Sequence, residues 1–304
     1  MKKLCGLLFS LALLCMQPAS ASSSEQSPDA SKVHLGSVHA AVFDVENGSA
    51  LYEKNSDAVV SIASITKLMT AMVVLDSGQS LHDMIEIKPI VRELGKNTYS
   101  RMRIGSELSR RDLLLIALMS SENLAAINLA KAHPGGFDAF VKAMNEKAKS
   151  LGMNSSHFVE PSGLKSGNVS TAADLVKMVV AANDYPLITE FSTTAQHDVR
   201  FKNPRYTLSY ANTNALVRGG KWDINLSKTG YTTEAGRCLV MMTDIDGRSV
   251  AMVLLDSLGK RTPLGDAGRI KKWLTVGKSG KVAGVARRYE REKVAKYTQA
   301  STSN

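Results

Sequence analysis

The sequence has 304 residues and a formal net charge of +10, from 38 Lys and Arg against 28 Asp and Glu. With 44% hydrophobic and 22% charged residues it has the composition of a globular protein, which excludes disorder throughout the chain. Its three cysteines are too few for a disulfide scaffold, and neither they nor the six histidines show the spacing of a zinc site.

The N-terminus has the three parts of a secretory signal peptide. Lys2-Lys3 precedes an apolar run over residues 4–16, and Ala19-Ser20-Ala21 supplies a small-residue cleavage site. A retained membrane anchor is the alternative, but the apolar run is short for spanning a bilayer. We therefore expect a signal peptide over residues 1–21, cleaved after Ala21, and a flexible, Ser-rich lead-in over residues 22–34.

Export changes the meaning of the charge and of the cysteines. The mature chain would keep one thiol, Cys238, which lies in an apolar run and is expected to be a buried small hydrophobe. A basic chain can bind nucleic acid, but an exported protein has little access to it, and no recognition motif is present. We expect no nucleic-acid partner, and an anionic polymer outside the cytoplasm instead.

The N-terminal half predicts a β-hairpin followed by helices. Residues 38–45 and 49–53 read as two strands joined at Asn47-Gly48, a two-residue hairpin signal. From about residue 62 to residue 182 the apolar spacing becomes helical. The expected helices cover residues 68–75, 111–119, 124–133 and 137–151, and a fifth begins after a capping box formed by Ser170-Thr171 and Asp174.

Strand patterns return in the C-terminal third. The expected strands cover residues 206–210, 224–228, 237–244 and 249–255, and residues 270–274 close a final helix. Asp246-Gly247 marks a second hairpin between the last two strands. The sequence therefore predicts an α/β fold of the α+β kind. One antiparallel sheet is built from both chain ends and flanked by helices, with an all-helical subdomain inserted.

Residues 278–304 form a basic C-terminal tail, with seven basic and two acidic residues. Such a segment is typical of a solvated tail or a loosely docked helix. The alternative is a peripheral contact with anionic lipid or with wall polymer.

A serine nucleophile with a lysine base can be built from Ser-x-x-Lys, because positions i and i+3 of a helix are neighbours. The spacing occurs three times, at Ser64 and Lys67, at Ser162 and Lys165, and at Ser257 and Lys260. The last two carry glycine and fall in predicted loops. Only Ser64 opens a long apolar helix, where the positive end of the helix dipole can face developing negative charge.

Two further motifs are selected by the same test of context. Ser121-x-Asn123 lies between two predicted helices, whereas its second occurrence at residues 166–168 lies in a loop. Lys228-Thr229-Gly230 ends a predicted strand, whereas the similar triplets at residues 165–167 and 278–280 do not. A strand edge at residue 228 could pair with an extended peptide, and the glycine would allow its backbone to come close.

The order and the spacing of the three motifs, 57 and 107 residues apart, match the signature of penicillin-binding proteins and serine β-lactamases. The chain resembles the low-molecular-mass penicillin-binding proteins of peptidase family S11, and among them the D-alanyl-D-alanine endopeptidase type. The resemblance extends over residues 35–277, the expected catalytic domain, and is carried by segments such as ASITKLMTAMVVLD (63–76) and SKTGYTTEAGRCLVM (227–241). It implies a β-lactamase/transpeptidase-like fold with the active site between the sheet and the helical subdomain.

The resemblance also implies roles for the motif residues. Ser64 would attack the carbonyl of a penultimate D-Ala, and Lys67 would take its proton. Ser121 and Lys228 would relay protons, and the charge of Lys228 would lower the pKa of Lys67.

The remaining motif residues would bind the substrate. Asn123 would orient the substrate amide, and Thr229 would bind a carboxylate. Gly230 would allow close approach, and the N–H groups of Ser64 and Tyr231 would form the oxyanion hole. Water would hydrolyse the acyl-enzyme without a metal or another cofactor, and β-lactam antibiotics would acylate Ser64 as covalent inhibitors.

Three departures from relatives narrow the expected activity. The β-lactamases that destroy antibiotics rapidly place a glutamate followed by Leu-Asn between the second and third motifs, whereas this chain has residues 160–164, Glu-Pro-Ser-Gly-Leu. Carboxypeptidases carry an arginine for the terminal carboxylate, and Asp266 stands near that position. Arg261 or Arg269 is the possible substitute. The chain also stops near the expected end of its catalytic domain.

We therefore expect a periplasmic serine endopeptidase that cuts D-Ala–diaminopimelate cross-links between peptidoglycan stem peptides. A D-alanyl-D-alanine carboxypeptidase is the nearest alternative. An inactive peptidoglycan-binding module is the alternative of another class.

Overall fold

The structure, a computed structural model, describes residues 28–89 and 99–302, with side chains up to residue 297. The predicted signal peptide and residues 22–27 of the lead-in lie outside the described residues. The strands are β1 (Ser37–Asp44), β2 (Ser49–Lys54), β3 (Val60–Ser61), β4 (Met84–Glu86), β5 (Glu107–Ser109), β6 (Val169–Ser170), β7 (Gln196–Phe201), β8 (Tyr206–Ala211), β9 (Ile224–Thr232), β10 (Gly236–Ile245) and β11 (Arg248–Ser257).

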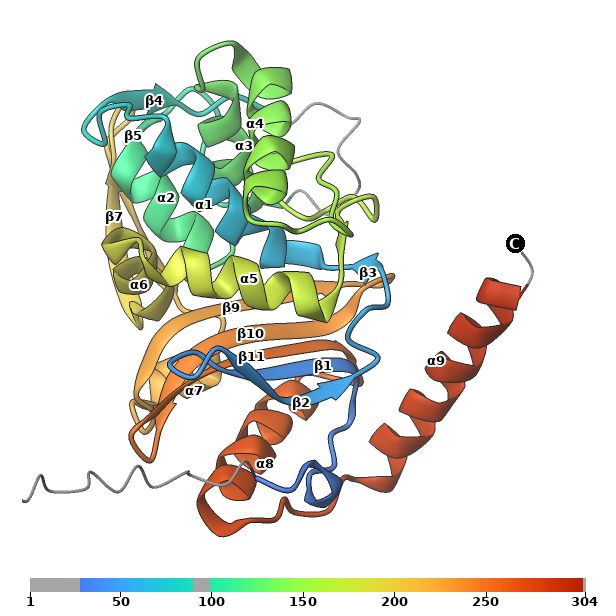
Figure 1. Cartoon of the computed structure of the whole chain (residues 1–304). Helices are drawn as coiled ribbons and strands as arrows, with labels where there is room; N and C mark the ends of the chain where they lie inside the picture. Colours follow the sequence, from blue (N-terminus) through green and yellow to red (C-terminus); the bar gives the residue numbers. More distant parts are fainter. Residues whose placement is uncertain (1–27, 90–98, 303–304) are drawn as a thin grey trace, which may run out of the picture.

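The helices surround a central sheet, with most of them above it and α8 below it in the view of Figure 1. They are η1 (Ala30–Lys32), η2 (Ala63–Ile65), α1 (Thr66–Asp76), α2 (Arg110–Met119), α3 (Asn123–Lys131), α4 (Gly136–Ser150), α5 (Ala172–Asn183), α6 (Pro186–Thr193), α7 (Ala215–Gly219), α8 (Thr262–Val276) and α9 (Gly284–Thr302). No helix of the described residues has the length and apolarity to cross a membrane.

The central sheet joins both ends of the chain, as predicted. Its five antiparallel strands run in the order β2-β1-β11-β10-β9, so the N-terminal hairpin pairs with the C-terminal strands through β1 and β11. Both predicted hairpins are present, because β1 pairs with β2 and β10 pairs with β11. The expected fold class, with helices inserted between the two halves of an antiparallel sheet, is confirmed (Figure 1).

Helix α1 is the centre of the helical subdomain. Its residues 66–74 are all buried, which explains why its sequence is a continuous apolar run rather than an amphipathic stripe. The helices α2, α3, α4 and α5 pack around it. The N-cap half of the predicted capping box is present at the start of α5, where the Thr171 side chain accepts a hydrogen bond from the Asp174 N–H, whereas the Asp174 carboxylate accepts from Ser155 N–H and Ser156 Oγ instead of closing the box.

The second face of the sheet is covered by α8. Trp273 and Ile270 of this helix are fully buried against a cluster that includes Leu239 and Met252 from the sheet. The sheet therefore has two apolar faces, which is typical of a three-layer arrangement of helices, sheet and helix.

Two strand predictions need correction. Strand β9 does not end at Lys228 but continues to Thr232, because residues 229–232 go on pairing with β10. The strand predicted at residues 206–210 is not part of the central sheet. It is β8, which pairs with β7 in a separate ribbon. Strand periodicity marks both segments but does not say which partner each will find.

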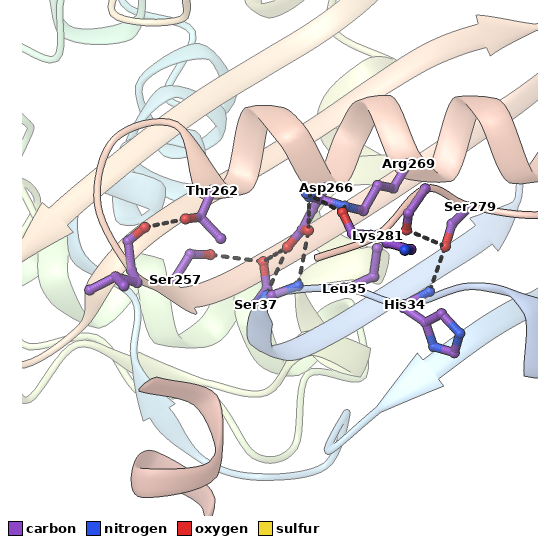
Figure 2. A network of polar contacts seen from close by, with 12 residues as sticks. His34, Leu35, Ser37, Ser257, Thr262, Asp266, Arg269, Ser279 and Lys281 are labelled. Carbon is purple, nitrogen blue, oxygen red and sulfur yellow. Dashed lines mark hydrogen bonds and ion pairs between the residues drawn. The ribbon is translucent and has the colours of Figure 1, made fainter. Parts of the chain in front are cut away.

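The N-terminal lead-in is docked rather than flexible over residues 28–34. Val33 is 3% exposed, and the indole N–H of Trp273 donates to the Asp29 carbonyl at 2.9 Å. The His34 N–H donates to Ser279 Oγ at 2.9 Å, so the lead-in meets the start of the predicted tail (Figure 2). The predicted boundaries at residues 34 and 277 therefore do not separate folded from unfolded chain.

Most of the basic tail is helix α9, so of the two forms expected for this segment, a solvated tail or a loosely docked helix, the docked helix is the one observed over residues 284–297. Glu290 forms an ion pair with Lys54 at 2.8 Å, and Lys293 forms one with Asp256 at 3.1 Å. The hydroxyls of Tyr289 and Tyr297 also donate to the Asp256 carboxylate. The helix is attached to the end of the sheet where β1 begins and β11 ends.

Candidate active site

Ser64 lies in the short helix η2, directly before α1, and is half-buried. The preceding residue, Ala63, has a φ of +47°, a conformation that is costly for a residue with a side chain. Two glycines allow neighbouring segments to approach this turn. A Cβ on Gly163 would stand 1.9 Å from the Ala63 carbonyl oxygen, and one on Gly230 would stand 3.1 Å from Ser64 N. Gly230 thus lets strand β9 pack against the Ser64 turn, and its predicted role in the close approach of a substrate peptide stays a prediction.

Lys67 is completely buried, one turn after Ser64. Its Nζ lies 3.0 Å from Ser64 Oγ, 2.7 Å from Asn123 Oδ1 and 2.5 Å from the Ser162 carbonyl oxygen. A neutral amine has two N–H donors and one lone pair. It can donate to the amide oxygen and to the carbonyl oxygen, which leaves the lone pair for the hydroxyl of Ser64. The three contacts therefore fit a lysine that accepts a proton from Ser64.

Burial lowers the pKa of Lys67 to about 8, because the charged ammonium loses its hydration. The nearby carboxylates of Glu160 and Glu122 act in the opposite direction and limit the fall. The sequence-based expectation assigned the shift to the charge of Lys228. Burial is the larger cause, and the electrostatic effect is visible instead on Lys228, whose pKa the charge of Lys67 helps to lower.

Ser121 lies in the tight turn between α2 and α3, as predicted. Its φ of +62° is unusual for a residue with a side chain. The turn is held by the Glu122 carboxylate, which accepts a hydrogen bond from the Leu124 N–H at 3.2 Å and caps α3. Strain of this kind is typical of functional sites, where the surrounding structure fixes a side-chain direction.

Lys228 is 1% exposed and joins Ser121 to strand β9. Its Nζ donates to Ser121 Oγ and to the Thr229 carbonyl, both at 2.9 Å. Burial, aided by the charge of Lys67, holds the pKa of Lys228 well below its usual range. The three predicted motifs are therefore brought together. Ser64 contacts Lys67, Lys67 contacts Asn123, and Ser121 of the same turn contacts Lys228.

The loop of residues 160–164 also belongs to the site, although no motif predicted it. The Glu160 carboxylate is fully buried and accepts hydrogen bonds from the Ser162 N–H at 2.7 Å and from the Gly163 N–H at 2.5 Å. The loop presents the Ser162 carbonyl to Lys67. Glu160 is thus bonded within its own loop, unlike a carboxylate that would activate water in the cleft. A contact through a backbone carbonyl leaves no side-chain signal, so the sequence marks this loop only through Gly163 and through the comparison of residues 160–164 with relatives.

The other two Ser-x-x-Lys spacings do not form nucleophile–base pairs. Ser162 donates its hydroxyl to Glu160, and Ser257 Oγ lies 2.8 Å from Ser37 Oγ. Cys238 is buried, as predicted, and burial raises the pKa of its thiol to about 12. The described residues contain no group of three or more His, Cys, Asp or Glu side chains that could hold a metal ion.

The reacting groups open into a cleft of about 610 Å³. Its lining includes Ser64, Ser121, Asn123, Thr213, Thr229, Gly230, Tyr231, Arg218, Arg237, Lys260 and Arg261. Thr229 Oγ1 donates to Thr213 Oγ1 at 2.6 Å, and the Tyr231 side chain is exposed. All the substrate-binding residues predicted from the sequence therefore reach this cleft except Lys228, which lies buried beside it.

Of the two arginines considered as carboxylate binders, only Arg261 lines the cleft. Arg269 is committed elsewhere, because it forms an ion pair with Asp266 at 2.8 Å and donates to the Lys281 carbonyl (Figure 2). Asp266 is fully buried and accepts hydrogen bonds from the N–H groups of Gly36 and Ser37. The aspartate near the family's arginine position is therefore part of the docking of the lead-in.

The sequence profile of the D-alanyl-D-alanine carboxypeptidase family, peptidase S11, matches residues 24–259. The chain is similar to the D-alanyl-D-alanine endopeptidase of Escherichia coli K12, with 46% identity over 96% of each chain. It is also similar to the D-alanyl-D-alanine endopeptidase of Pseudomonas aeruginosa, with 50% identity over 84% of this chain and 82% of that one.

Solved structures show the same fold. The Streptomyces K15 DD-transpeptidase superposes with a TM-score of 0.73 at 26% identity, covering 81% of this chain and 98% of that chain. Penicillin-binding protein D2 of Listeria monocytogenes, solved in its cefotaxime-bound form, superposes with a TM-score of 0.69 at 31% identity over the same shares.

Proposed function

Because the chain belongs to the D-alanyl-D-alanine carboxypeptidase family of S11 peptidases, we propose that it cuts D-Ala–diaminopimelate cross-links in peptidoglycan through an acyl-enzyme on Ser64. The observation that carries the chemistry is the fully buried Lys67, with Nζ 3.0 Å from Ser64 Oγ and a pKa lowered to about 8. The endopeptidase subtype is supported by the two relatives of that name, which are 46–50% identical over most of the chain.

In the acylation step, Ser64 Oγ forms a bond to the carbonyl carbon of the D-Ala residue, and its proton passes to Lys67 Nζ. The negative charge on the carbonyl oxygen is placed against the N–H groups of Ser64 and Tyr231. The C–N bond of the cross-link then breaks, and the leaving amine takes a proton from Lys67 through Ser121. The contact of Lys228 with Ser121, at 2.9 Å, orients this hydroxyl.

Water hydrolyses the acyl-enzyme in the second step. The water oxygen bonds to the acyl carbon, the ester bond to Ser64 breaks, and the proton of the water returns to the serine. Lys67 is neutral at the start and at the end, so one lysine serves both steps. Asn123 Oδ1 accepts a hydrogen bond from Lys67, and Asn123 also lines the cleft. It can therefore hold Lys67 in position and contact the substrate amide.

β-Lactams are proposed as covalent inhibitors of the same serine. The structural relative from Listeria monocytogenes is a penicillin-binding protein with cefotaxime bound, which supports β-lactam binding in this fold. The Glu160 carboxylate is bonded within its loop, so this chain has no counterpart there of a water-activating glutamate. We therefore expect a long-lived acyl-enzyme rather than rapid antibiotic hydrolysis.

A D-alanyl-D-alanine carboxypeptidase is the second candidate, and Arg261 is the observation that favours it. An arginine that lines the same cleft as Thr229 could hold the free carboxylate of a terminal D-Ala. An inactive wall-binding module is disfavoured, because a binding surface would have no need of a buried lysine aimed at a serine.

We place the mature protein in the periplasm. The proposal is supported by the basic, apolar and small-residue segments of residues 1–21 and by a substrate that lies outside the cytoplasm. A peripheral contact of the basic C-terminal segment, with anionic lipid or with wall polymer, belongs to the same proposal, since seven basic residues lie within residues 278–304.

The decisive experiment is product analysis on purified cross-linked muropeptide dimers. We expect the wild type to convert dimers to monomers, Ser64→Ala to convert none, and Ser257→Ala, whose hydroxyl contacts Ser37 outside the cleft, to retain the activity as the matched control. Release of free D-Ala without monomer formation would assign the carboxypeptidase activity instead. No product at all from the wild type would contradict both candidates.

A further inference from the structure

The cleft extends well beyond the reacting groups, across edge strand β9. Thr229 of this strand pairs with Leu239 of β10, and both residues line the cleft together with Pro263 and Leu264 at the start of α8. Leu239 belongs to the apolar cluster that α8 covers. A peptide group held at Thr229 can therefore continue over the edge of the sheet toward α8.

Four cations line this extension, and we call them the cationic shelf. Arg218 comes from α7, Arg237 from β10, and Lys260 and Arg261 from the loop between β11 and α8. No acidic residue is found among the described residues that line the cleft. None of the ion pairs between described residues involves the shelf. The shelf is therefore a concentration of positive charge without an internal counter-ion.

The shelf is partly fixed in place before any ligand binds. The guanidinium of Arg237 lies 3.7 Å from the centre of the Tyr231 ring, its cross-strand neighbour. Arg218 donates a hydrogen bond to the Asn212 carbonyl. The N-terminal end of α8, which points its positive dipole at this part of the cleft, adds to the same field. Less entropy is lost when a ligand meets side chains that are already held.

The number of cations exceeds what a leaving D-Ala requires, since Thr229 and one arginine suffice for a single carboxylate. When a cross-link is cut, the leaving group is an entire acceptor stem peptide, which carries carboxylates on diaminopimelate and on D-glutamate. We propose that the cationic shelf binds this anionic acceptor stem and so favours cross-linked over uncross-linked substrates. The inference rests on the proposed endopeptidase function. It identifies the part of the cleft that makes the enzyme prefer cross-linked substrates.

The test compares two substrates with three single variants and one double variant. Arg237→Gln and Lys260→Gln each remove one shelf charge, and Lys272→Gln removes a matched exposed lysine of α8 away from the cleft. We expect kcat/KM on cross-linked dimers to fall about threefold for each shelf variant and about tenfold for the double variant, mainly through KM. D-Ala release from a pentapeptide monomer should change less than twofold, and Lys272→Gln should leave both rates unchanged.

Two further measurements are the salt dependence of the selective loss and a control for correct folding of each variant. The selective loss should shrink when the salt concentration is raised to 0.5 M, because exposed charges are then screened over about 4 Å. Acylation by fluorescent penicillin, which is too small to span the shelf, reports the folded site in every variant. An equal fall on both substrates, or no fall on either, would overturn the shelf proposal alone. A wild type that never cleaves dimers would overturn the proposed function and the shelf with it.

Discussion

Buried charge is used in opposite ways on the two sides of the sheet. Behind the sheet, the Asp266 carboxylate is fully buried and accepts hydrogen bonds from Gly36 N, Ser37 N and Ser37 Oγ, with Arg269 as its ion-pair partner (Figure 2). In the cleft, Lys67 and Lys228 are buried as well. Among the described residues, neither has a carboxylate within ion-pair distance.

The difference separates a structural charge from a reactive one. A buried carboxylate that is engaged by four partners fixes the chain segments that donate to it. A buried ammonium without a counter-ion loses its proton easily, and the neutral amine can then act as a base. The same burial therefore stabilises the fold around Asp266 and prepares catalysis around Lys67.

The largest expected effect comes from making the charge of residue 67 permanent. Arginine cannot lose its proton in a protein, so Lys67→Arg keeps the positive charge and removes the base. We expect the rate of acylation by fluorescent penicillin to fall by about 10²- to 10⁴-fold. If Lys67→Arg were acylated at the wild-type rate, a proton-accepting role of this residue would be wrong.

The pH dependence should show the lowered pKa of Lys67. Its pKa of about 8 means that the protonated, inactive form dominates below pH 8. We expect the acylation rate to rise by about tenfold per pH unit up to pH 8 and to level off above it. A rise that continues toward pH 10.5, the ordinary value for lysine, would contradict the effect of burial.

Glu122→Gln should sharpen this measurement. The Glu122 carboxylate raises the pKa of Lys67, and its neutral amide keeps the oxygen that caps α3. Removing the negative charge should move the acidic limb of the profile to lower pH. A shift to higher pH, or none, would show that this carboxylate does not act on the base.

Behind the sheet, Asp266→Asn should lower the stability of the fold and leave the acylation of Ser64 unchanged. The amide loses the ion pair with Arg269 and turns one acceptor into a donor. We therefore expect the free energy of unfolding to fall by about 3 kcal/mol in urea titrations. Penicillin acylation of the folded fraction should stay within about twofold of the wild type. Loss of acylation in a folded protein would place Asp266 in the active site instead.

The smallest expected effect concerns the attachment of α9. Tyr289→Phe removes one of several groups that contact the Asp256 carboxylate, with Tyr297 and Lys293 remaining. We expect a loss of about 1 kcal/mol in stability. Amide hydrogen exchange should become faster in α9 and stay unchanged in α1. Equal acceleration in both helices would mean that α9 is part of the central core.

The sequence was most informative where local pattern and chemistry coincide. Ser64 and Lys67 could be found because the Ser-x-x-Lys spacing stands at the start of an apolar helix. Both hairpins could be found because the Asn-Gly and Asp-Gly turns form without a distant partner. The docked lead-in could not be found, since it depends on Asp266, about 230 residues away. The contact between the Ser162 carbonyl and Lys67 was missed, because every residue type carries the same backbone carbonyl. The cause of the Lys67 pKa shift was misjudged because burial is a property of the fold.

The central claim is that Ser64 alone carries the acyl group. It is tested most directly by incubating the wild-type protein with saturating penicillin, followed by intact-mass measurement and peptide mapping. We expect a single adduct on the peptide that contains Ser64. An unmodified protein, or an adduct on the peptide of Ser162 or Ser257, would contradict it.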